Sequence, residues 1–417
     1  MSTVACPYCY HPINQHKLAY QCLGRGVPGG PRCAKREDEL RQQLTNVRTA
    51  AYPTFVPASR RLFGNGVKTL LGSGGTSACP HCGGRTGLRA CPACHTPLSS
   101  IFAESRSPLV GMVGGKGAGK TVYLSVLYHE LCTTVRRRFL ADIRLTGDQQ
   151  GGAGSPRQWL ENYVEQLFTH GRLFEQTAES RNGQRAPVVL EWRQPQRRLG
   201  SPTLGPRRFG TTVLSFYDAA GEDLTSQERV HTQAYLGVAN GLILLLDPWQ
   251  LPGAMGRIDV PAAAVREAEP PLEVLNRITE LLRVSHQVKA SRRVQVPLAV
   301  VFAKMDAFFP ALGGNHPLLV KPAAPVHHHT MAGYDEATGQ DTHEHVRAML
   351  HDYGADDIDA HLMHNYATFR YFAVSALGAT PDYAAKAVDP GGVQPFRVEE
   401  PLLWLLKGFG VIDRSRP

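Results

Sequence analysis

Short apolar runs recur along residues 108–417, and each ends in small or polar residues. Runs of this length, bounded by turn residues, are typical of buried strands in a parallel sheet. Two stretches between them, 122–131 and 271–288, instead repeat apolar residues at helical spacing. Because strands alternate with helices, the pattern predicts an α/β domain: a mostly parallel sheet flanked by helices. The predicted strands are 109–113, 211–217, 241–246, 297–302 and 369–374.

Weaker patterns predict further elements. Residues 187–192 form an apolar stretch that predicts a strand, and 34–44 is predicted to be a short charged helix. Helices are also predicted at 341–350 and 398–406. Residues 52–77 are rich in Pro and Gly, which predicts loop and linker.

The composition is that of a soluble protein. The chain has 417 residues, 42% of them hydrophobic and 19% charged, which suits two or three domains with cores. No apolar run approaches the roughly 20 residues that span a bilayer, and the N-terminus lacks a secretory pattern. We therefore expect a cytoplasmic protein without a membrane partner. Arginine outnumbers lysine by 35 to 10, which suggests a GC-rich, bacterial genome.

Charge and cysteine divide the chain unevenly. Residues 1–107 hold 13 Lys and Arg against 4 Asp and Glu, whereas residues 108–417 hold 32 of each sign. Eight of the nine cysteines lie before residue 95. Two regions of different chemistry are predicted: a zinc-ribbon-like, cysteine-rich module at 1–107 and the α/β domain at 108–417.

Two CxxC knuckles, eight residues apart, predict a zinc site. Each such turn directs two thiolates at one centre, and tetrahedral zinc takes four ligands. A looser set, in which ten residues separate the last two cysteines, predicts a second site. The spacing also allows the two sets to interleave. The first set is Cys79, Cys82, Cys91 and Cys94, and the second is Cys6, Cys9, Cys22 and Cys33.

Histidines near the knuckles are candidate substitute ligands, although the bystander interpretation is simpler; they are His11, His16, His81 and His95. The positive charge of this module would also suit nucleic acid. Few aromatic residues are available there for base stacking, so docking of a protein partner is favoured over nucleic-acid binding.

Residues 109–121 read LVGMVGGKGAGKT and contain G-x-x-x-x-G-K-T. The preceding strand and following helix are the context that a phosphate-binding loop requires. Glycines let backbone N–H groups turn toward phosphate, and the helix N-terminus adds its dipole. Lys120 is predicted to reach the β- and γ-phosphates, and Thr121 to bind Mg²⁺. Cys132, on the same helix, is predicted to be a core residue.

Three further motifs follow predicted strands. DAAG begins at Asp218, whose carboxylate fits the Mg²⁺ side of a P-loop site. AKMD ends at Asp306, and SAL begins at Ser375.

These four motifs, in this order, resemble those of the Ras-like and translation-factor class of P-loop GTPases over about residues 108–410. The resemblance implies GTP as substrate, GDP as product and Mg²⁺ as cofactor. It implies that the Asp306 carboxylate accepts from guanine N1 and N2, that Lys304 stacks on the base, and that Gly221 senses the γ-phosphate. The implied nucleotide-binding residues are Gly114, Gly115, Lys116, Gly117, Ala118, Gly119, Lys120, Thr121, Asp218, Gly221, Lys304, Asp306, Ser375 and Ala376.

Three positions depart from that family. Ala303 stands where Asn or Thr is usual, which predicts weaker guanine affinity. Glu222 stands where many relatives carry a water-orienting Gln, and a carboxylate lacks the amide donor, so slow hydrolysis is expected. Thr177 is the candidate switch residue that closes on Mg²⁺, with Thr169 and Thr146 as rivals. The implied catalytic set is Lys120, Glu222 and Thr177, and the implied Mg²⁺ ligands are Thr121, Asp218 and Thr177.

Zinc ribbons, a P-loop domain with insertions and the VEEPLLWLL segment are together similar to bacterial double-GTPase proteins of regulatory or conflict-defence systems. The favoured hypothesis is a GTP-hydrolysing switch whose zinc module docks a partner. A zinc-dependent adaptor with little turnover is the alternative, and an ATPase is the third. The basic stretch 194–210 is predicted to be a solvated hairpin loop. The histidines around 327–329 form a weak candidate metal site.

Overall fold

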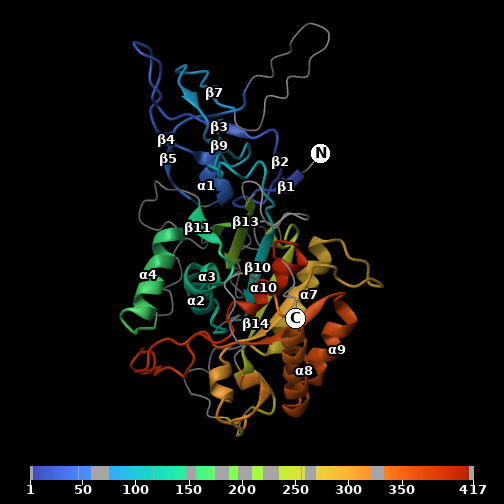
Figure 1. Ribbon diagram of the computed structural model, residues 1–417. Helices are drawn as coiled ribbons and strands as arrows, with labels where there is room; N and C mark the ends of the chain where they lie inside the picture. The colour runs from blue at the N-terminus through green and yellow to red at the C-terminus, as the bar shows by residue number, and fades with distance from the viewer. Residues whose placement is uncertain are drawn as a thin grey trace, which may run out of the picture.

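The computed structural model describes most of the chain in two parts, a cysteine-rich part from β1 to β9 and an α/β part from β10 to α10 (Figure 1). The described residues are 3–45, 47–57, 75–115, 117–146, 156–173, 187–195, 209–218, 234–254, 256–258, 269–320 and 333–412.

The α/β part is built on a sheet of seven described strands in the order β11-β12-β13-β10-β14-β15-β16. The strands from β13 to β16 run parallel, whereas β11 and β12 pair antiparallel. The strand that leads into the P-loop therefore lies at the centre of the sheet. The bounds are β10 (Leu109–Gly114), β11 (Asp142–Thr146), β12 (Val188–Pro195), β13 (Phe209–Asp218), β14 (Gly241–Leu246), β15 (Leu298–Phe302) and β16 (Phe369–Ala373).

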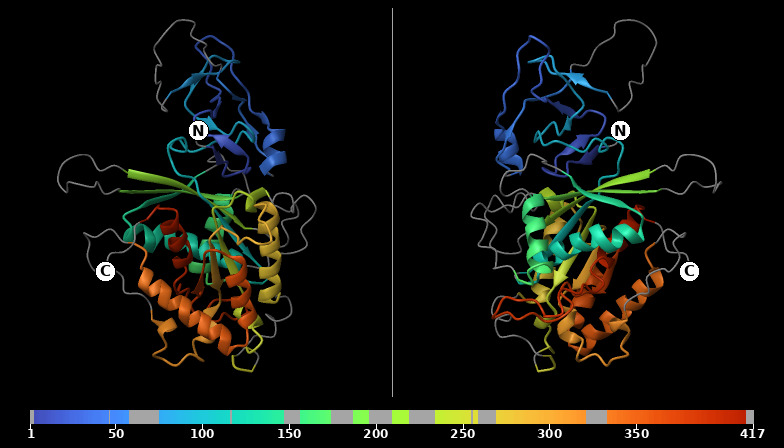
Figure 2. Two further views of the ribbon diagram at one scale, coloured as in Figure 1. Left: turned by 90° about the vertical axis from the view of Figure 1, so that its right-hand side faces the viewer. Right: turned by 60° about the vertical axis from the view of Figure 1, so that its left-hand side comes forward.

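Helices cover both faces of this sheet (Figure 2). Every residue of β10, β14 and β15 is buried, as expected for strands between two helical layers. One core contains side chains of α7, α8 and α9, and the other those of α2, α4 and α10. The helices are α2 (Lys120–Glu130) with its π-helical continuation (Leu131–Val135), α3 (Arg136–Arg138), α4 (Pro156–Phe168), α7 (Pro271–Ser285), α8 (Glu336–Asp352), α9 (Asp356–Asn365) and α10 (Glu400–Gly408). This arrangement confirms the predicted fold class.

The predicted boundaries needed local corrections. The helix expected at 34–44 is a short strand, β4 (Arg36–Glu37), followed by α1 (Glu39–Thr45), because β4 pairs with β5 (Ala50–Ala51). α8 begins before the predicted residue 341. The Asp335 carboxylate accepts hydrogen bonds from the backbone N–H groups of Ala337 and Thr338 and caps the helix there.

The cysteine-rich part contains short strands and turns. Two hairpins each enclose one CxxC knuckle, β1–β2 around Cys6–Cys9 and β7–β8 around Cys79–Cys82. A three-stranded sheet in the order β6-β3-β9 joins segments distant in sequence. The bounds are β1 (Thr3–Ala5), β2 (Pro12–Asn14), β3 (Ala19–Gln21), β6 (Thr54–Phe55), β7 (Ser77–Ala78), β8 (Arg85–Thr86) and β9 (Arg89–Ala90).

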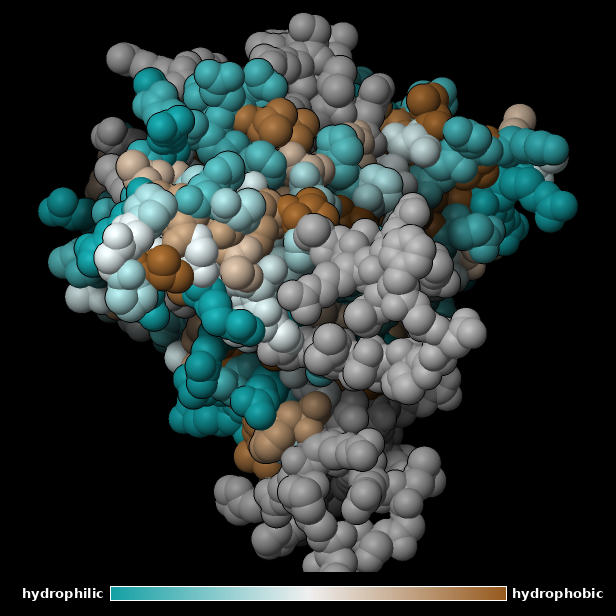
Figure 3. Space-filling model, turned by 90° about the horizontal axis from the view of Figure 1, so that it is seen from above, coloured by the Kyte–Doolittle hydropathy of each residue, from teal (hydrophilic) through white to brown (hydrophobic). Residues whose placement is uncertain are grey.

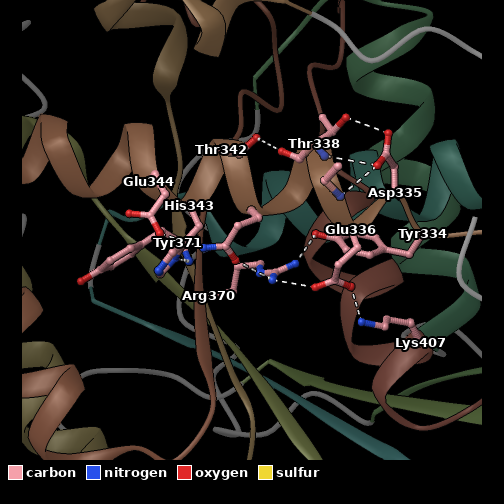
Figure 4. Close-up of polar contacts among 12 residues, drawn as sticks. Tyr334, Asp335, Glu336, Thr338, Thr342, His343, Glu344, Arg370, Tyr371 and Lys407 are labelled. Atoms are coloured by element: carbon pink, nitrogen blue, oxygen red, sulfur yellow. Dashed lines mark hydrogen bonds and ion pairs between the residues drawn. The ribbon is translucent and has the colours of Figure 1, made fainter. Parts of the chain in front are cut away.

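A polar network fixes β16 against α8 and α10 (Figure 4). The buried Arg370 guanidinium lies 2.7 Å from a Glu336 carboxylate oxygen, and the other oxygen of Glu336 contacts Lys407 Nζ. The backbone N–H of Tyr371 donates to His343 Nδ1 at 3.1 Å. Because β16 leads directly into Ser375, this network holds the start of the SAL motif in place. None of the helices in the described part of the chain has the length and apolar character needed to cross a membrane.

Candidate nucleotide site and cysteine clusters

The P-loop follows β10 and has the backbone that its glycines allow. Gly117 and Gly119 have φ of 74° and 83°, in the left-handed region that favours glycine. A Cβ on Gly114 would lie 2.6 Å from the Leu245 carbonyl oxygen, so the close approach of β14 also requires glycine. Ala118 is buried. Lys116 lies outside the described residues.

Lys120 and Thr121 begin α2. The Lys120 ammonium donates to the Gly114 and Gly115 carbonyl oxygens, both at 2.9 Å, so its charge stays on the loop. The first turn of α2 has no acidic residue, which leaves the helix dipole free to attract an anion. The loop thus offers a lysine, a hydroxyl and a helix N-terminus to phosphate.

β13 brings Asp218, the first residue of the DAAG motif, to the same end of the sheet as the P-loop. Asp218, the last residue of β13, pairs in register with Met112 of the parallel strand β10. Carboxyl ends of neighbouring parallel strands meet at one sheet edge, where α/β proteins commonly bind ligands. The candidates Gly221, Glu222 and Thr177 lie outside the described residues, as do 196–208 of the basic hairpin. The pairing of β12 with β13 agrees with that hairpin.

The AKMD and SAL motifs meet at the ends of β15 and β16. The Ser375 hydroxyl donates to Asp306 Oδ1 at 2.5 Å, and the Thr380 hydroxyl lies 3.4 Å from Asp306 Oδ2. Burial raises the pKa of Asp306, although both hydroxyls and the charge of Lys304 act in the opposite direction. The Gly378 N–H donates to Ser375 Oγ and orients it. Ala376 follows Ser375 and packs against the α2 and α10 core.

Lys304 has partners that the motifs did not predict. Its Nζ lies 2.6 Å from Asp247 Oδ2 and 4.3 Å from the centroid of the Trp249 ring. The Tyr383 ring meets the same ring in a T-shaped contact, with centroids 5.9 Å apart. The sequence marked Asp247 only as the residue after a strand; the parallel pairing of Leu246 with Phe302 is what brings it to Lys304. The Ala303 methyl, by contrast, has no hydrogen-bonding atom.

The cysteines form two clusters, but the predicted pairing is wrong. Each cluster combines one early and one late segment, which is the interleaved alternative that the spacing allowed. The antiparallel pairing of Ala19 with Ala90 brings the segments together. We call the sets the inner cluster, Cys6, Cys9, Cys91 and Cys94, and the outer cluster, Cys22, Cys33, Cys79 and Cys82.

Both clusters fit zinc. The four sulfurs of each lie within 4.8 Å of one another, and individual S···S distances are 3.5–3.9 Å. Tetrahedral zinc–thiolate bonds would separate the sulfurs by about 3.8 Å. A hydrogen bond from the Gly84 N–H lowers the pKa of Cys82 to about 6, which favours a thiolate. Such sets could each hold one zinc ion.

Histidines complete neither cluster. His95 Nδ1 lies 2.9 Å from Asp38 Oδ2, and His11 Nδ1 lies 3.2 Å from the Cys9 carbonyl oxygen. Across the described ranges, no third group of three or more potential metal ligands comes together. His327, His328 and His329 lie outside those ranges. Cys132 is partly buried on the π-helical continuation of α2 and belongs to neither cluster.

The inner cluster packs directly on the α/β part. Its four cysteines share one hydrophobic core with Val189 of β12 and Val213 of β13. The buried Ser215 hydroxyl of β13 donates to the Pro7 carbonyl oxygen, inside the Cys6–Cys9 knuckle, at 2.9 Å. Tyr10 meets Tyr235 edge-to-face at 5.0 Å between centroids. The knuckle therefore contacts the strand that ends in Asp218.

A curated mycobacterial protein is similar to most of this chain. The chain is 26% identical, over 340 residues, to the putative ESX-1 scaffolding and assembly protein SaeC of Mycolicibacterium smegmatis. The match covers 78% of this chain and 81% of that protein. No protein-family model matches.

Solved structures that resemble the chain include a GTPase-like domain, a complex with GDP and a G domain. The S. cerevisiae Ski7 GTPase-like domain bound to GTP matches with 11% identity and a TM-score of 0.33, covering 75% of this chain and 52% of that one. Sup35 complexed with GDP matches with 12% identity and a TM-score of 0.23, covering 71% and 44%. The T. maritima FeoB G domain covers 47% and 72%, with 12% identity and a TM-score of 0.17. This chain thus spans about half of the first two structures, and these scores are too low to carry any inference about activity.

Proposed function

We propose that this protein binds and hydrolyses GTP with Mg²⁺ and acts as a molecular switch. The observation that carries the proposal is that two groups of candidate residues lie at the same edge of the sheet. A glycine loop with Lys120 and Thr121 ends β10, and the Asp306–Ser375 pair lies at the ends of β15 and β16. The first suits phosphate, and the second offers a carboxylate to the guanine N1 and N2 donors.

The residues at the phosphate end fit Mg²⁺, because hydroxyl and carboxylate oxygens are the donors that it prefers. Thr121 and, through water, Asp218 would hold the ion, which would neutralise charge on the β- and γ-phosphates. Lys120 would leave the loop carbonyls for the phosphates and stabilise charge on the transferred group. Thr177 and Gly221 are proposed to move between nucleotide states, and Glu222 to accept a hydrogen bond from the attacking water.

A paired titration with fluorescent GDP and ADP in Mg²⁺ tests the guanine assignment. Wild type should prefer GDP, and Asp306→Ala should lose that preference. Asp306→Asn should gain affinity for xanthosine diphosphate, because its amide can donate to the xanthine O2. Asp359→Asn is the control, since Asp359 is also a buried carboxylate but accepts hydrogen bonds from Tyr371 and Arg347 instead. Equal or ADP-favouring affinity in wild type would overturn the proposal and leave the ATPase alternative.

We further propose that the cysteine-rich part docks a protein partner. Seen from above, its described surface presents hydrophobic residues in separate groups among hydrophilic ones (Figure 3). A polar, mixed surface of this kind suits a reversible contact better than a permanent one. Cytoplasmic location, a double-GTPase type and a role in a bacterial regulatory or conflict-defence system belong to the same proposal.

A nucleotide-binding adaptor with little turnover is the second candidate. Its support is the relative described as a scaffolding and assembly protein, together with Glu222 and the missing amide at Ala303. Single-turnover hydrolysis with protein in excess over GTP separates the two functions. Slow phosphate release that Lys120→Ala abolishes would favour the switch. Tight GTP binding without release above the Lys120→Ala background would favour the adaptor.

A further inference from the structure

We propose that Asp247 and Trp249 are positioning residues for the base end of the nucleotide site, where they hold the Lys304 side chain that is proposed to stack on the base. The inference rests on the proposed function, because it concerns how that same site recognises a guanine base. It assigns a role to two residues that lie outside all four nucleotide motifs.

Asp247 uses both oxygens of one buried carboxylate. It directly follows β14, where Oδ1 accepts from the backbone N–H of Trp249 at 3.1 Å and starts a 3₁₀ turn (Pro248–Gln250). Oδ2 accepts from Lys304 Nζ at 2.6 Å. The Asp247 side chain is 3% exposed and that of Lys304 19%. The backbone contact fixes the carboxylate, and the carboxylate then fixes the ammonium, in a site where water competes little.

Trp249 supplies the second restraint. Its buried ring lies 4.3 Å from Lys304 Nζ, within the range of a cation–π contact. Tyr383, from the segment that follows the SAL motif, packs on the same indole in a T-shaped contact. The Trp249 ring, which follows β14, is therefore also contacted by the segment that follows β16.

The geometry explains why Lys304 needs these partners. Its φ is 58°, a left-handed conformation that a residue with a side chain adopts at a cost. A lysine free at the surface would also lose rotamer freedom when its stem packs against a base. Because the ammonium is already held, that loss is reduced before the ligand arrives. Lys304 also lies near enough to Asp306 for its charge to lower the pKa of that carboxyl.

The test compares a guanine nucleotide with a ligand that has no base. Affinities of Asp247→Asn, Trp249→Phe and Trp249→Leu are measured for fluorescent GDP by titration and for inorganic tripolyphosphate by competition, all in Mg²⁺. Asp247→Asn should weaken GDP binding about tenfold, as loss of a charge-assisted hydrogen bond does. Trp249→Leu should do the same, and Trp249→Phe should recover most of the affinity because it keeps a ring face. Tripolyphosphate affinity should not change.

Trp404→Phe is the matched control. Trp404 is also a buried indole in the α/β part, but it lies on α10, where its ring contacts Phe372 and lies 5.8 Å from the Arg370 guanidinium, whereas Lys304 lies over Trp249. This control and Asp359→Asn should bind GDP as wild type does. Thermal unfolding of every variant identifies any that fail to fold. If Trp249→Leu fails to fold, Asp247→Asn still decides the test, because it keeps the shape of the side chain.

The outcomes separate the inference from the proposed function. If Asp247→Asn binds GDP as tightly as wild type does, the inference is overturned. The proposed function still stands in that case, provided that Asp306→Ala loses its affinity for GDP. Equal losses of GDP and tripolyphosphate would also overturn it, because they indicate a structural role. If wild type does not distinguish GDP from ADP, the proposed function fails and the inference fails with it.

Discussion

The two cysteine clusters have the same ligand set but different surroundings. Each joins a CxxC knuckle to cysteines distant in the chain. The inner cluster shares its hydrophobic core with β12 and β13 of the sheet. The outer cluster packs against Tyr20, Phe55 and Tyr52, all from the cysteine-rich part. One cluster is thus built into the α/β part, and the other supports only its own segment, as far as the described residues extend.

This difference shows that the two clusters need not have the same structural role. An N-terminal zinc module is easily taken for an independent appendage that docks a partner. Here the Cys6–Cys9 knuckle accepts a hydrogen bond from β13, three residues before Asp218. A metal in the inner cluster would therefore stabilise the strand that carries a proposed Mg²⁺ ligand, whereas a metal in the outer cluster would leave that strand unaffected.

Removing one ligand from each cluster should give the largest difference. We expect Cys9→Ser to destabilise the α/β part by on the order of 5 kcal/mol, because a structural metal contributes directly to folding. Cys82→Ser should lower the free energy of unfolding of the α/β part by less than about 1 kcal/mol. Urea unfolding followed by tryptophan fluorescence measures this selectively, because all four tryptophans lie after residue 108.

Cys132→Ser is the matched control for that pair, since it changes a cysteine of the α/β part that belongs to neither cluster. Zinc content measured by atomic emission should fall by about one ion per chain in each cluster variant and not in the control. Equal destabilisation by Cys9→Ser and Cys82→Ser would contradict the distinction between the clusters.

Ligand binding should give the next largest effect. GDP with Mg²⁺ at about a hundred times its Kd should stabilise the wild-type α/β part by about 2.7 kcal/mol. The same increment should persist in Cys82→Ser, because the described residues that pack on the outer cluster all belong to the cysteine-rich part. It should shrink in Cys9→Ser and vanish in Lys120→Ala. Unfolding with and without GDP measures it, and an increment lost equally in both cluster variants would show that the outer cluster also matters.

The sequence predicted the strands whose ends carry the candidate site residues, because the motifs are local. The strand that ends at Gly114 and the strand that precedes Asp306 each depend on a short run of neighbouring apolar residues. The cysteine pairing depends instead on the register of Ala19 with Ala90, a contact between distant segments. The contact between Asp247 and Lys304 similarly requires knowing that β14 and β15 are neighbours. Spacing alone contains neither piece of information.

The smallest effect is expected at the hydrogen bond that joins the inner cluster to the sheet. Ser215→Ala removes the donor to the Pro7 carbonyl oxygen at a fully buried position, and should destabilise the α/β part by about 1 kcal/mol. A double-mutant cycle makes the small value informative. In the Cys82→Ser background the cost should be unchanged, because the outer cluster does not support Pro7. In the Cys9→Ser background it should nearly disappear, since the knuckle that presents the carbonyl is no longer held by a metal. If the cost were the same in both backgrounds, the Ser215 contact would be independent of the inner cluster, and β13 would not be linked to its metal through this bond.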